Sequence, residues 1–266
     1  MELQASSRWR CVDCISDLHL HASEPQTFAA WQRYLQTSAA DAVFLLGDIF
    51  EVWVGDDVLT QKSSFESQCA ETLRAASARM DVHILCGNRD FLMGPALAAA
   101  SHCTLLDDPT VLTFAGARWL LTHGDALCLD DTDYMQFRAQ VRGAEWQANF
   151  LAKPLAERIA IAQSLRAQSE ARKRSGTVVY ADVDSTAASA LLKAHGADHM
   201  VHGHTHKPAT HLLAAGRERL VLSDWDLQAR PPRADVLRLR RCETGSTESF
   251  TVERIPPSMA GRSGNA

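Results

Sequence analysis

Residues 11–21 read CVDCISDLHLH, a run of β-forming residues that ends in one aspartate and two histidines. The apolar and small residues before Ser16 predict a short buried strand. Side chains alternate along a strand with period two, so Asp17, His19 and His21 are expected on one face. Grouping an acid with imidazoles costs free energy unless an ion pair, a hydrogen bond or a metal compensates. The stretch therefore predicts a strand that carries potential metal ligands at its carboxyl end.

The composition indicates an ordinary soluble globular protein. Of 266 residues, 46% are hydrophobic and 22% are charged. The net charge of -5 disfavours bulk binding to nucleic acid. No N-terminal stretch has the apolar core of a signal peptide, and no apolar run approaches the length of a membrane span. We therefore expect a cytoplasmic protein, and we expect it to be a monomer.

Two of the seven cysteines, Cys11 and Cys14, have the spacing of a redox or zinc motif. In an extended strand, however, positions three apart point to opposite faces and lie about 10 Å apart, which is too far for a disulfide. An odd number of scattered cysteines also indicates reduced thiols that pack as small hydrophobes. Buried core cysteines are the better interpretation.

Short apolar runs alternate with amphipathic helical segments through the first half of the chain. This alternation predicts βαβ units and a mostly parallel sheet, and hence an α/β fold. From about residue 198 onward strand follows strand, and we expect a second, more antiparallel sheet packed on the first. The predicted strands of the first half are 11–16, 42–47, 82–87 and 118–124, and the helical segments include 26–38 and 64–79. The predicted strands of the second half are 199–204, 209–215, 218–225, 234–240 and 248–255.

Residues 134–176 differ from the rest because they are helical in pattern throughout. They carry eight Lys or Arg against three acids, inside a chain whose net charge is negative. We expect a single domain over residues 1–255, with this segment inserted as a helical cap, and a disordered tail over 256–266. An ordinary pair of surface helices is the alternative interpretation of the insertion.

Polar clusters follow five of the predicted strands. Ligands of open α/β sheets bind at the carboxyl ends of the strands, so these clusters are expected to meet. Each motif alone has an ordinary explanation as a turn or a cap, but five in succession do not. The clusters are Asp17 with His19, Asp48, Asn88-Arg89-Asp90, His123 with Asp125, and His202 with His204 and His206.

The residue types in these clusters indicate metal chemistry. Oxygen and imidazole ligands without thiolate suit manganese, iron or zinc, and manganese is favoured as the carboxylate and amide content rises. Two such ions about 3.5–4 Å apart can clamp a phosphoryl group and lower the pKa of a water. The sequence therefore predicts a two-metal phosphoester hydrolase that binds two divalent ions per chain, with Mn²⁺ expected.

The clusters resemble those of the calcineurin-like metallophosphoesterases, a family built as a four-layer α/β/β/α sandwich. Longer stretches resemble more closely a branch of the family that acts in lipid A biosynthesis and hydrolyses the pyrophosphate bond of UDP-2,3-diacylglucosamine. The resemblance runs from about residue 11 to residues 222–225. The stretches are SDLHL (16–20), LGDIFEVWVGDD (46–57), GNRDFLMG (87–94), THGDALCLDD (122–131) and HGHTHKPA (202–209).

The resemblance implies roles for individual residues. Asp48 would bridge the two ions, and the implied catalytic residues are Asp48, Asn88, Arg89 and His123. His21 and His202 match no ligand of the family, Asp56 and Asp57 are expected to anchor a loop, and Asp90 and Asp125 are expected to orient imidazoles or Arg89. The implied ligands are Asp17, His19 and His206 for the first ion, and Asn88, His123 and His204 for the second.

Arg89 indicates the kind of leaving group. Relatives with histidine at this position can protonate an alkoxide, whereas arginine stays charged and cannot donate its proton. A phosphate monoester departs as an anion and needs no proton, so a permanent cation over the bridging oxygens favours a diphosphate substrate. The alternative is an arginine that only forms an ion pair with Asp90.

The cap would complete the substrate site. Its apolar residues would shelter acyl chains, and its basic residues would face a diphosphate or the surface of the inner membrane. The resemblance implies substrate contacts for Asp131, Ser169 and Lys173, beside Asn88, Arg89 and His204. Relatives often have lysine where this chain has Gly176, so contacts in that loop depart from the family pattern.

The expected products are UMP and 2,3-diacylglucosamine 1-phosphate, formed on the cytoplasmic face of the inner membrane. Another calcineurin-like phosphodiesterase or a nucleotide pyrophosphatase is the enzymatic alternative. A non-catalytic scaffold of the same fold is disfavoured, because all seven implied ligands are present. A nucleic-acid binder is also disfavoured, because the basic residues lie in one short segment with few aromatic residues to stack on bases.

Overall fold

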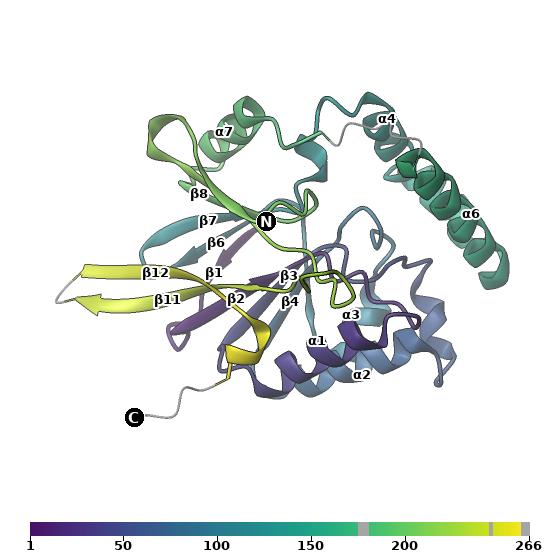
Figure 1. Ribbon diagram of the computed structural model, residues 1–266, viewed down its shortest axis with the longest axis horizontal. Coiled ribbons are helices and arrows are strands. Elements are labelled where there is room, and N and C mark those ends of the chain that lie inside the picture. The colour runs from purple at the N-terminus through teal and green to yellow at the C-terminus, as the bar shows by residue number, and fades with distance from the viewer. Residues whose placement is uncertain (175–180, 245–246, 262–266) are drawn as a thin grey trace.

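The computed structural model describes residues 1–174, 181–244 and 247–261, without the side chains of 166, 168–174, 243, 244 and 247. Two six-stranded sheets lie face to face, and helices cover their outer faces (Figure 1). This arrangement confirms the predicted α/β/β/α sandwich. The cysteines are all free, as predicted from their number and spacing.

The first sheet has the order β12-β11-β2-β3-β4-β5. Its four strands β2 to β5 are parallel, and β11 and β12 add an antiparallel hairpin at one edge. The strands are β2 (Cys11–Ile15), β3 (Ala42–Leu46), β4 (Asp81–Leu85), β5 (Thr104–Leu106), β11 (Val236–Thr244) and β12 (Thr247–Ile255). On its outer face lie α1 (Pro25–Thr37), α2 (Phe65–Ser77) and α3 (Pro95–Ser101).

The second sheet has the order β1-β6-β7-β8-β10-β9 and mixes parallel with antiparallel pairs. Helix α7 (Ser185–Ala194) packs on its outer face through Ala188 and Leu192. The strands are β1 (Glu2–Gln4), β6 (Thr110–Phe114), β7 (Ala117–Leu121), β8 (His199–His202), β9 (Ala209–Leu212) and β10 (Glu218–Val221).

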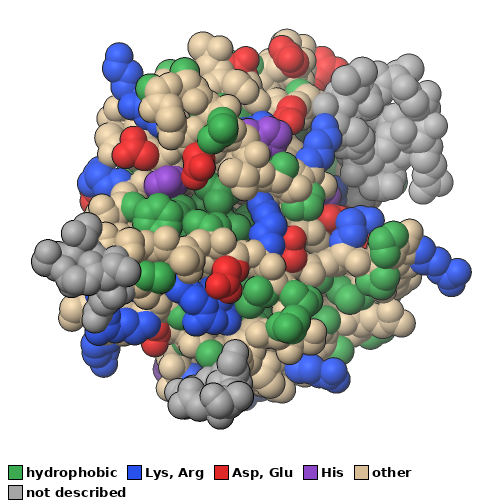
Figure 2. Space-filling model, turned by 60° about the vertical axis from the view of Figure 1, so that its left-hand side comes forward, with side chains coloured by type: hydrophobic (Ala, Val, Ile, Leu, Met, Phe, Trp, Pro, Cys, Tyr) green, Lys and Arg blue, Asp and Glu red, His purple; other side chains and the backbone are tan. Residues whose placement is uncertain are grey.

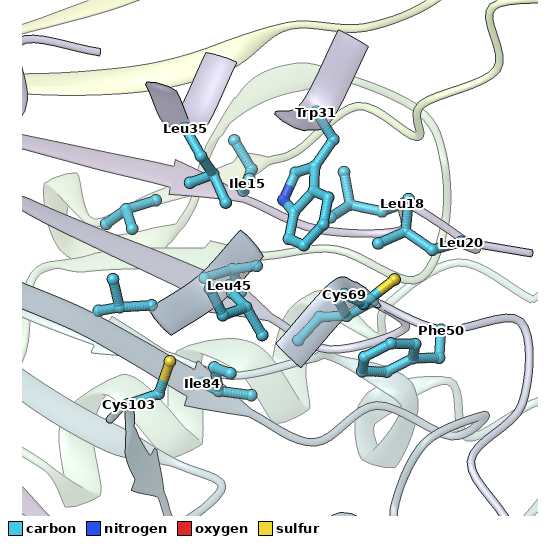
Figure 3. Close-up of a cluster of buried hydrophobic side chains, with 14 of the residues drawn as sticks. Ile15, Leu18, Leu20, Trp31, Leu35, Leu45, Phe50, Cys69, Ile84 and Cys103 are labelled. Carbon is cyan, nitrogen blue, oxygen red and sulfur yellow. The ribbon is translucent and has the colours of Figure 1, made fainter. Parts of the chain in front are cut away.

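The core between the first sheet and its helices is drawn in Figure 3. Ile15, Leu45 and Ile84 come from three neighbouring strands; Ile15 lies beside Leu35 and Trp31 of α1, and Ile84 lies further along the same cluster. All five are at most 1% exposed, so their apolar surface is fully removed from water. This packing holds β2, β3 and β4 in place relative to one another. It therefore also sets where the loops that follow these strands begin.

Cys11 and Cys14 lie in different cores, as their spacing predicts. Cys11 faces the helices, whereas Cys14 faces the second sheet. Burial raises the pKa of the Cys11 thiol to about 11, so it is protonated at neutral pH. Both thiols pack as small hydrophobes, and neither belongs to a redox or zinc pair.

The assignment of strands to sheets was partly wrong. The hairpin of β11 and β12 was expected in the second sheet but pairs with β2 in the first, and β7 lies in the second sheet. The physical reason is a buried ion pair across the β2–β11 register, where Arg238 stands opposite Asp13. Its Nε and Nη2 atoms donate to Asp13 Oδ1 and Oδ2 at 2.7 and 2.8 Å, and both side chains are at most 1% exposed.

The predicted disordered tail is corrected for residues 256–261. A short 3₁₀ helix, Pro257–Met259, leads to Ala260, which is fully buried and whose carbonyl accepts a hydrogen bond from Arg238 at 3.0 Å. Residues 262–266 lie outside the described part of the chain. Within that part, no helix combines the length and the apolar character needed to cross a membrane.

Replacing Arg238 by alanine is expected to lower the free energy of unfolding by about 3–5 kcal/mol, because a fully buried carboxylate at Asp13 loses its countercharge. Urea denaturation measures the effect. The control is Arg240→Ala on the same strand, whose half-exposed pairing with Glu253 should contribute at most about 0.5 kcal/mol. Equal stability of the two variants would contradict the role given to the buried pair.

Candidate metal centre

The seven predicted ligands meet at one end of the sandwich, in the loops that follow β2, β3, β4, β7 and β8. Parallel strands of both sheets end there, which places their carboxyl ends side by side. The loop after β2 is bound to the loop after β3, because the amide of His19 donates to the carbonyl of Asp48 at 3.0 Å. The amide of Gly203 similarly donates to the carbonyl of His123 at 3.1 Å.

The backbone of these loops has an unusual conformation. Eight non-glycine residues of the described chain have positive φ, and five of them are predicted ligands. Residues other than glycine rarely adopt this region, and strained backbone of this kind concentrates at functional sites. The five, with their φ values, are Asp17 (53°), His19 (46°), Asp48 (51°), His204 (67°) and His206 (54°).

This conformation corrects the strand argument for residues 17–21. The strand ends at Ile15, so alternation along a strand does not bring Asp17 and His19 together; the left-handed loop does. His21 lies outside the cluster, where its Nδ1 and the hydroxyl of Ser23 are 2.7 Å apart. Asp17 and His19 do lie close together, but the geometric reason given for it was wrong.

Three side chains form a first set of donors. His19 Nε2 and His206 Nε2 lie 3.4 Å apart, and Asp17 Oδ1 is 3.2 Å from His206 Nε2. The ligand atoms of this group lie within 4.8 Å of one another. Two imidazole nitrogens and a carboxylate oxygen that converge in this way suit a divalent cation. The set therefore fits a metal ion.

A second set surrounds the side-chain oxygen of Asn88. This oxygen is 3.0 Å from His123 Nε2 and 2.9 Å from His204 Nδ1. Asp48 lies between the two sets, with Oδ1 3.6 Å from His123 Nε2 and Oδ2 4.0 Å from His19 Nε2. Each oxygen of Asp48 thus faces a different set, which is the arrangement that a bridging carboxylate requires.

The charges of the site favour a cation. Burial by itself would lower the pKa of His123, but the carboxylates of Asp48, Asp17 and Asp125 outweigh it and raise this pKa to about 9. Burial would raise the pKa of Asp17, yet the hydrogen bond to His206 and the charge of His123 hold it below the usual range. At neutral pH the negative charge of these buried carboxylates therefore favours a protonated imidazole. A metal ion that binds there would displace the proton.

Glycine allows the loops to approach closely. A Cβ atom on Gly87 would lie 2.2 Å from Asp48 Oδ1 and 2.3 Å from the Asp48 amide. One on Gly203 would lie 2.3 Å from Asp17 Oδ2. Any side chain at these two positions would displace a candidate ligand. This steric constraint explains why glycine occupies them in the GNRD and HGH motifs.

Arg89 does not pair with Asp90. Its Nη1 donates to Glu51 Oε1 at 2.5 Å, and its Nε lies 3.9 Å from Asp48 Oδ2. Asp90 instead accepts the backbone amides of Ile49 and Gly87, both at 2.7 Å. The expectation that Asp90 orients an imidazole or Arg89 is therefore corrected: it holds the backbone of two loops.

Two carboxylates behind the first donor set were missed. Glu51 Oε2 lies 3.4 Å from His19 Nδ1, and Asp224 Oδ2 lies 3.7 Å from His206 Nδ1. Arg233 donates to Asp224 at 2.7 Å. The LGDIFE and LSDW stretches contain both carboxylates, and a search for acids three residues beyond each ligand would have found Glu51.

Other residues behave largely as predicted. His202 is buried and accepts a hydrogen bond from Arg219 Nη1 at 3.3 Å, so it is a structural histidine. Asp56 accepts three backbone amides at the start of α3, and Asp57 pairs with Arg158. Asp125 accepts the hydroxyl of Tyr134 and Nε of Arg138, and so it holds a helix of the insertion instead of an imidazole.

The segment expected to form a cap contains the helices α4 (Thr132–Val141), α5 (Ala144–Leu151) and α6 (Leu155–Arg174). Figure 1 shows α6 extending to one side of the two sheets. Phe150 and Trp146 attach the segment to the core of the first sheet. Asp131 caps α4 by accepting the amide of Tyr134 at 3.0 Å.

The basic residues of this segment were expected to face a diphosphate or a membrane surface. Those that the structure describes instead contact other groups of the protein. Arg138 donates to Asp125, Arg142 donates to the carbonyl of Gly87 at 2.8 Å, and Arg158 is buried. Lys153 pairs with Glu157. The side chains of Ser169 and Lys173, and Gly176, lie outside the described residues.

Comparisons with known proteins show the family of the chain. The model of the calcineurin-like phosphoesterase family matches residues 12–208. A UDP-2,3-diacylglucosamine hydrolase of Bordetella pertussis is 44% identical over 232 residues, which cover 85% of this chain and 90% of the relative. One of Chromobacterium violaceum is 46% identical over 222 residues, covering 80% and 90%.

Replacing Gly87 by alanine is expected to weaken binding of divalent metal by at least about tenfold, because the new methyl group must displace Asp48. Titration calorimetry with Mn²⁺ on the metal-free protein measures this. Gly261→Ala is the matched control, since its Cβ would meet only the carbonyl of Thr37, at 3.4 Å. Unchanged affinity in the Gly87 variant would refute the steric argument.

Proposed function

The chain belongs to the calcineurin-like phosphoesterases, and on that basis we propose that it hydrolyses the pyrophosphate bond of UDP-2,3-diacylglucosamine. The products are UMP and 2,3-diacylglucosamine 1-phosphate. The observation that carries the proposal is the similarity, over most of the chain, to hydrolases named for this lipid. The stretches that contain the seven convergent side chains lie within the matched region.

Two divalent cations complete the proposed site, and we propose Mn²⁺ for both. The donor set of Asp17, His19 and His206 would hold one, and the set of Asn88, His123 and His204 the other, with Asp48 shared. When bound, such ions neutralise phosphoryl oxygens and lower the pKa of a water. The mixed oxygen and imidazole donors, without thiolate, support this choice of metal.

The protein's own contribution to the reaction centres on Arg89. Glu51 fixes its guanidinium close to Asp48, so the charge is in place before a substrate arrives. A planar guanidinium can contact two oxygens of a diphosphate at once. It gives no proton, and the departing phosphate monoester needs none. Arg89 is therefore suited to a diphosphate and poorly suited to an alkoxide leaving group.

The α4–α6 segment and the loop before it supply apolar surface for a lipid. Five large apolar residues there are between 37% and 46% exposed, so each leaves part of its apolar side chain in contact with water. We propose that they shelter acyl chains at the cytoplasmic face of the inner membrane, with Asp131, Ser169 and Lys173 contacting the substrate. The five are Leu129, Phe137, Leu151, Ile159 and Leu165.

The surface gives little support to a nucleic-acid partner. On the face shown in Figure 2, Lys and Arg side chains are interspersed with Asp and Glu. Among the described residues on that face, neither sign of charge covers a continuous area. Binding to a polyanion relies on a basic stripe or patch.

The proposal is tested by giving the purified protein Mn²⁺ and UDP-2,3-diacylglucosamine and following the products by phosphorus NMR. Equal appearance of UMP and of the sugar 1-phosphate is expected, together with loss of turnover in the presence of a chelator. A phosphate monoester and a cyclic nucleotide serve as alternative substrates. Faster hydrolysis of either would overturn the substrate assignment and leave the family unchanged.

Arg89→Ala is expected to lower kcat by about 10²–10³-fold, the usual effect of removing one fixed donor to a developing anion. The number of Mn²⁺ ions bound at saturation should not change, because no candidate ligand is removed. Arg240→Ala, far from the site on β11, is the control for loss of an arginine. A variant with kcat within the error of the unmodified protein would show that Arg89 is only structural.

A further inference from the structure

Glu51 occupies a junction between three loops of the site. It follows Asp48 by three residues, in a segment that continues the pairing of β2 with β3 beyond the strands. The amide of Leu20 donates to the carbonyl of Ile49 at 2.8 Å, and the amide of Glu51 donates to the carbonyl of Leu20 at 3.1 Å. This pairing turns the Glu51 side chain towards the metal centre, where it is 9% exposed.

The two carboxylate oxygens of Glu51 face different functional groups. Oε1 accepts from Arg89 Nη1 at 2.5 Å, and Oε2 lies 3.4 Å from His19 Nδ1. The other ring nitrogen of His19, Nε2, points into the donor set beside His206. His19 Nδ1 is buried and has no hydrogen bond to any described residue, so Glu51 is its nearby acceptor.

We propose that Glu51 is a positioning residue that holds His19 for metal binding and Arg89 for the diphosphate, and thereby couples the two. The role of Arg89 in this inference rests on the function proposed above, whereas the part that concerns His19 does not. With the proton of His19 held on Nδ1 by the carboxylate, the Nε2 lone pair is free for a cation.

An ionised carboxylate is required for this role. A buried carboxylate is stable only with a compensating charge, which Arg89 supplies. The amide of a glutamine has the same shape but one acceptor and one donor. If its oxygen faces Arg89, its NH₂ group faces His19 Nδ1 and favours the opposite tautomer; if the amide turns over, it presents a donor to the guanidinium.

The other imidazoles of the site are supported differently, which makes Glu51 distinctive. His206 has Asp224 behind it, but Asp224 pairs with Arg233, whose Nε donates to Asp224 Oδ1 at 2.9 Å. His123 Nδ1 lies 2.9 Å from the carbonyl of Leu46, a neutral acceptor. Glu51 contacts the side chains of both His19 and Arg89 without being a candidate metal ligand itself.

The first test uses the full chain and no substrate, so it is independent of the proposed reaction. In metal-free Glu51→Gln, nitrogen-15 NMR of the imidazoles should show the His19 proton moved from Nδ1 towards Nε2. Calorimetry with Mn²⁺ should show one of the two binding events weakened by about 10–100-fold. Wild-type tautomer and wild-type affinity would overturn the proposal.

Two controls accompany this test. Glu71→Gln removes an exposed carboxylate of α2 and should change neither readout. Glu51→Asp keeps the charge but is one methylene shorter and cannot span both groups, and it serves if Glu51→Gln does not fold. An aspartate variant that keeps both the His19 tautomer and the coupling to Arg89 would refute the idea.

The second test measures the coupling through kcat on the UDP-linked lipid. If Glu51 acts through Arg89, then adding Glu51→Gln to Arg89→Ala at saturating Mn²⁺ should lower kcat by no more than about twofold. Asp224→Asn, which lies behind His206, should instead add its full effect to that of Arg89→Ala. Additive losses for Glu51 would overturn the coupling, while failure of the unmodified protein to hydrolyse the lipid would refute only the proposed substrate.

Discussion

The centre depends on a buried carboxylate that binds backbone amides. Asp90 is fully buried and accepts the amides of Ile49, Phe50 and Gly87, so it holds the loops after β3 and β4 against each other. Burial and the charge of Asp48 raise the pKa of Asp90 to about 6. Its ionised form remains favourable at neutral pH because the amides solvate it in place of water. Together with the amide of His19, which donates to the Asp48 carbonyl, and the amide of Arg89, which donates to Asp48 Oδ1, this contact supports the left-handed conformation of Asp48.

The same principle operates at the junction of the two sheets. Asp17 accepts the amide of His204 through both oxygens, at 3.1 and 2.9 Å, and the hydroxyl of Ser16 at 2.5 Å. A candidate ligand from the first sheet thus fixes the backbone of the loop that carries two ligands from the second. The candidate ligands therefore depend on the packing of the two sheets. Moving one sheet relative to the other would separate the ligands of the first sheet from those of the second.

The fold and the gathering of polar residues at the strand ends could be predicted from the sequence because both are local signals, whereas the assignment of individual ligands followed from the resemblance to a family. Apolar runs identify strands, and polar residues at the ends of strands identify the site. The partner of a strand is a tertiary property: the C-terminal hairpin joins the first sheet through Arg238 and Asp13, 225 residues apart in sequence. The positive φ angles could not be predicted either, because Asp48 and His19 favour other conformations unless packing imposes this one. Glu51 lies only three residues after Asp48, but its contacts with His19 and Arg89 become visible only where three loops meet.

Charge explains why the basic residues of the site and its surroundings are so fully paired. Arg89, Arg138 and Arg233 each bind a buried acid near the donors, and Arg142 binds the carbonyl of Gly87. The acids would otherwise repel one another in a low-dielectric interior. The hydrogen bonds of the first three arginine side chains go to the outer carboxylates, whereas Asp17 and Asp48 accept backbone amides and face the imidazoles of His206 and His123. The inner negative charge is thus left for protons or for metal ions, so that affinity for a cation follows from the same charge distribution that orients Arg89.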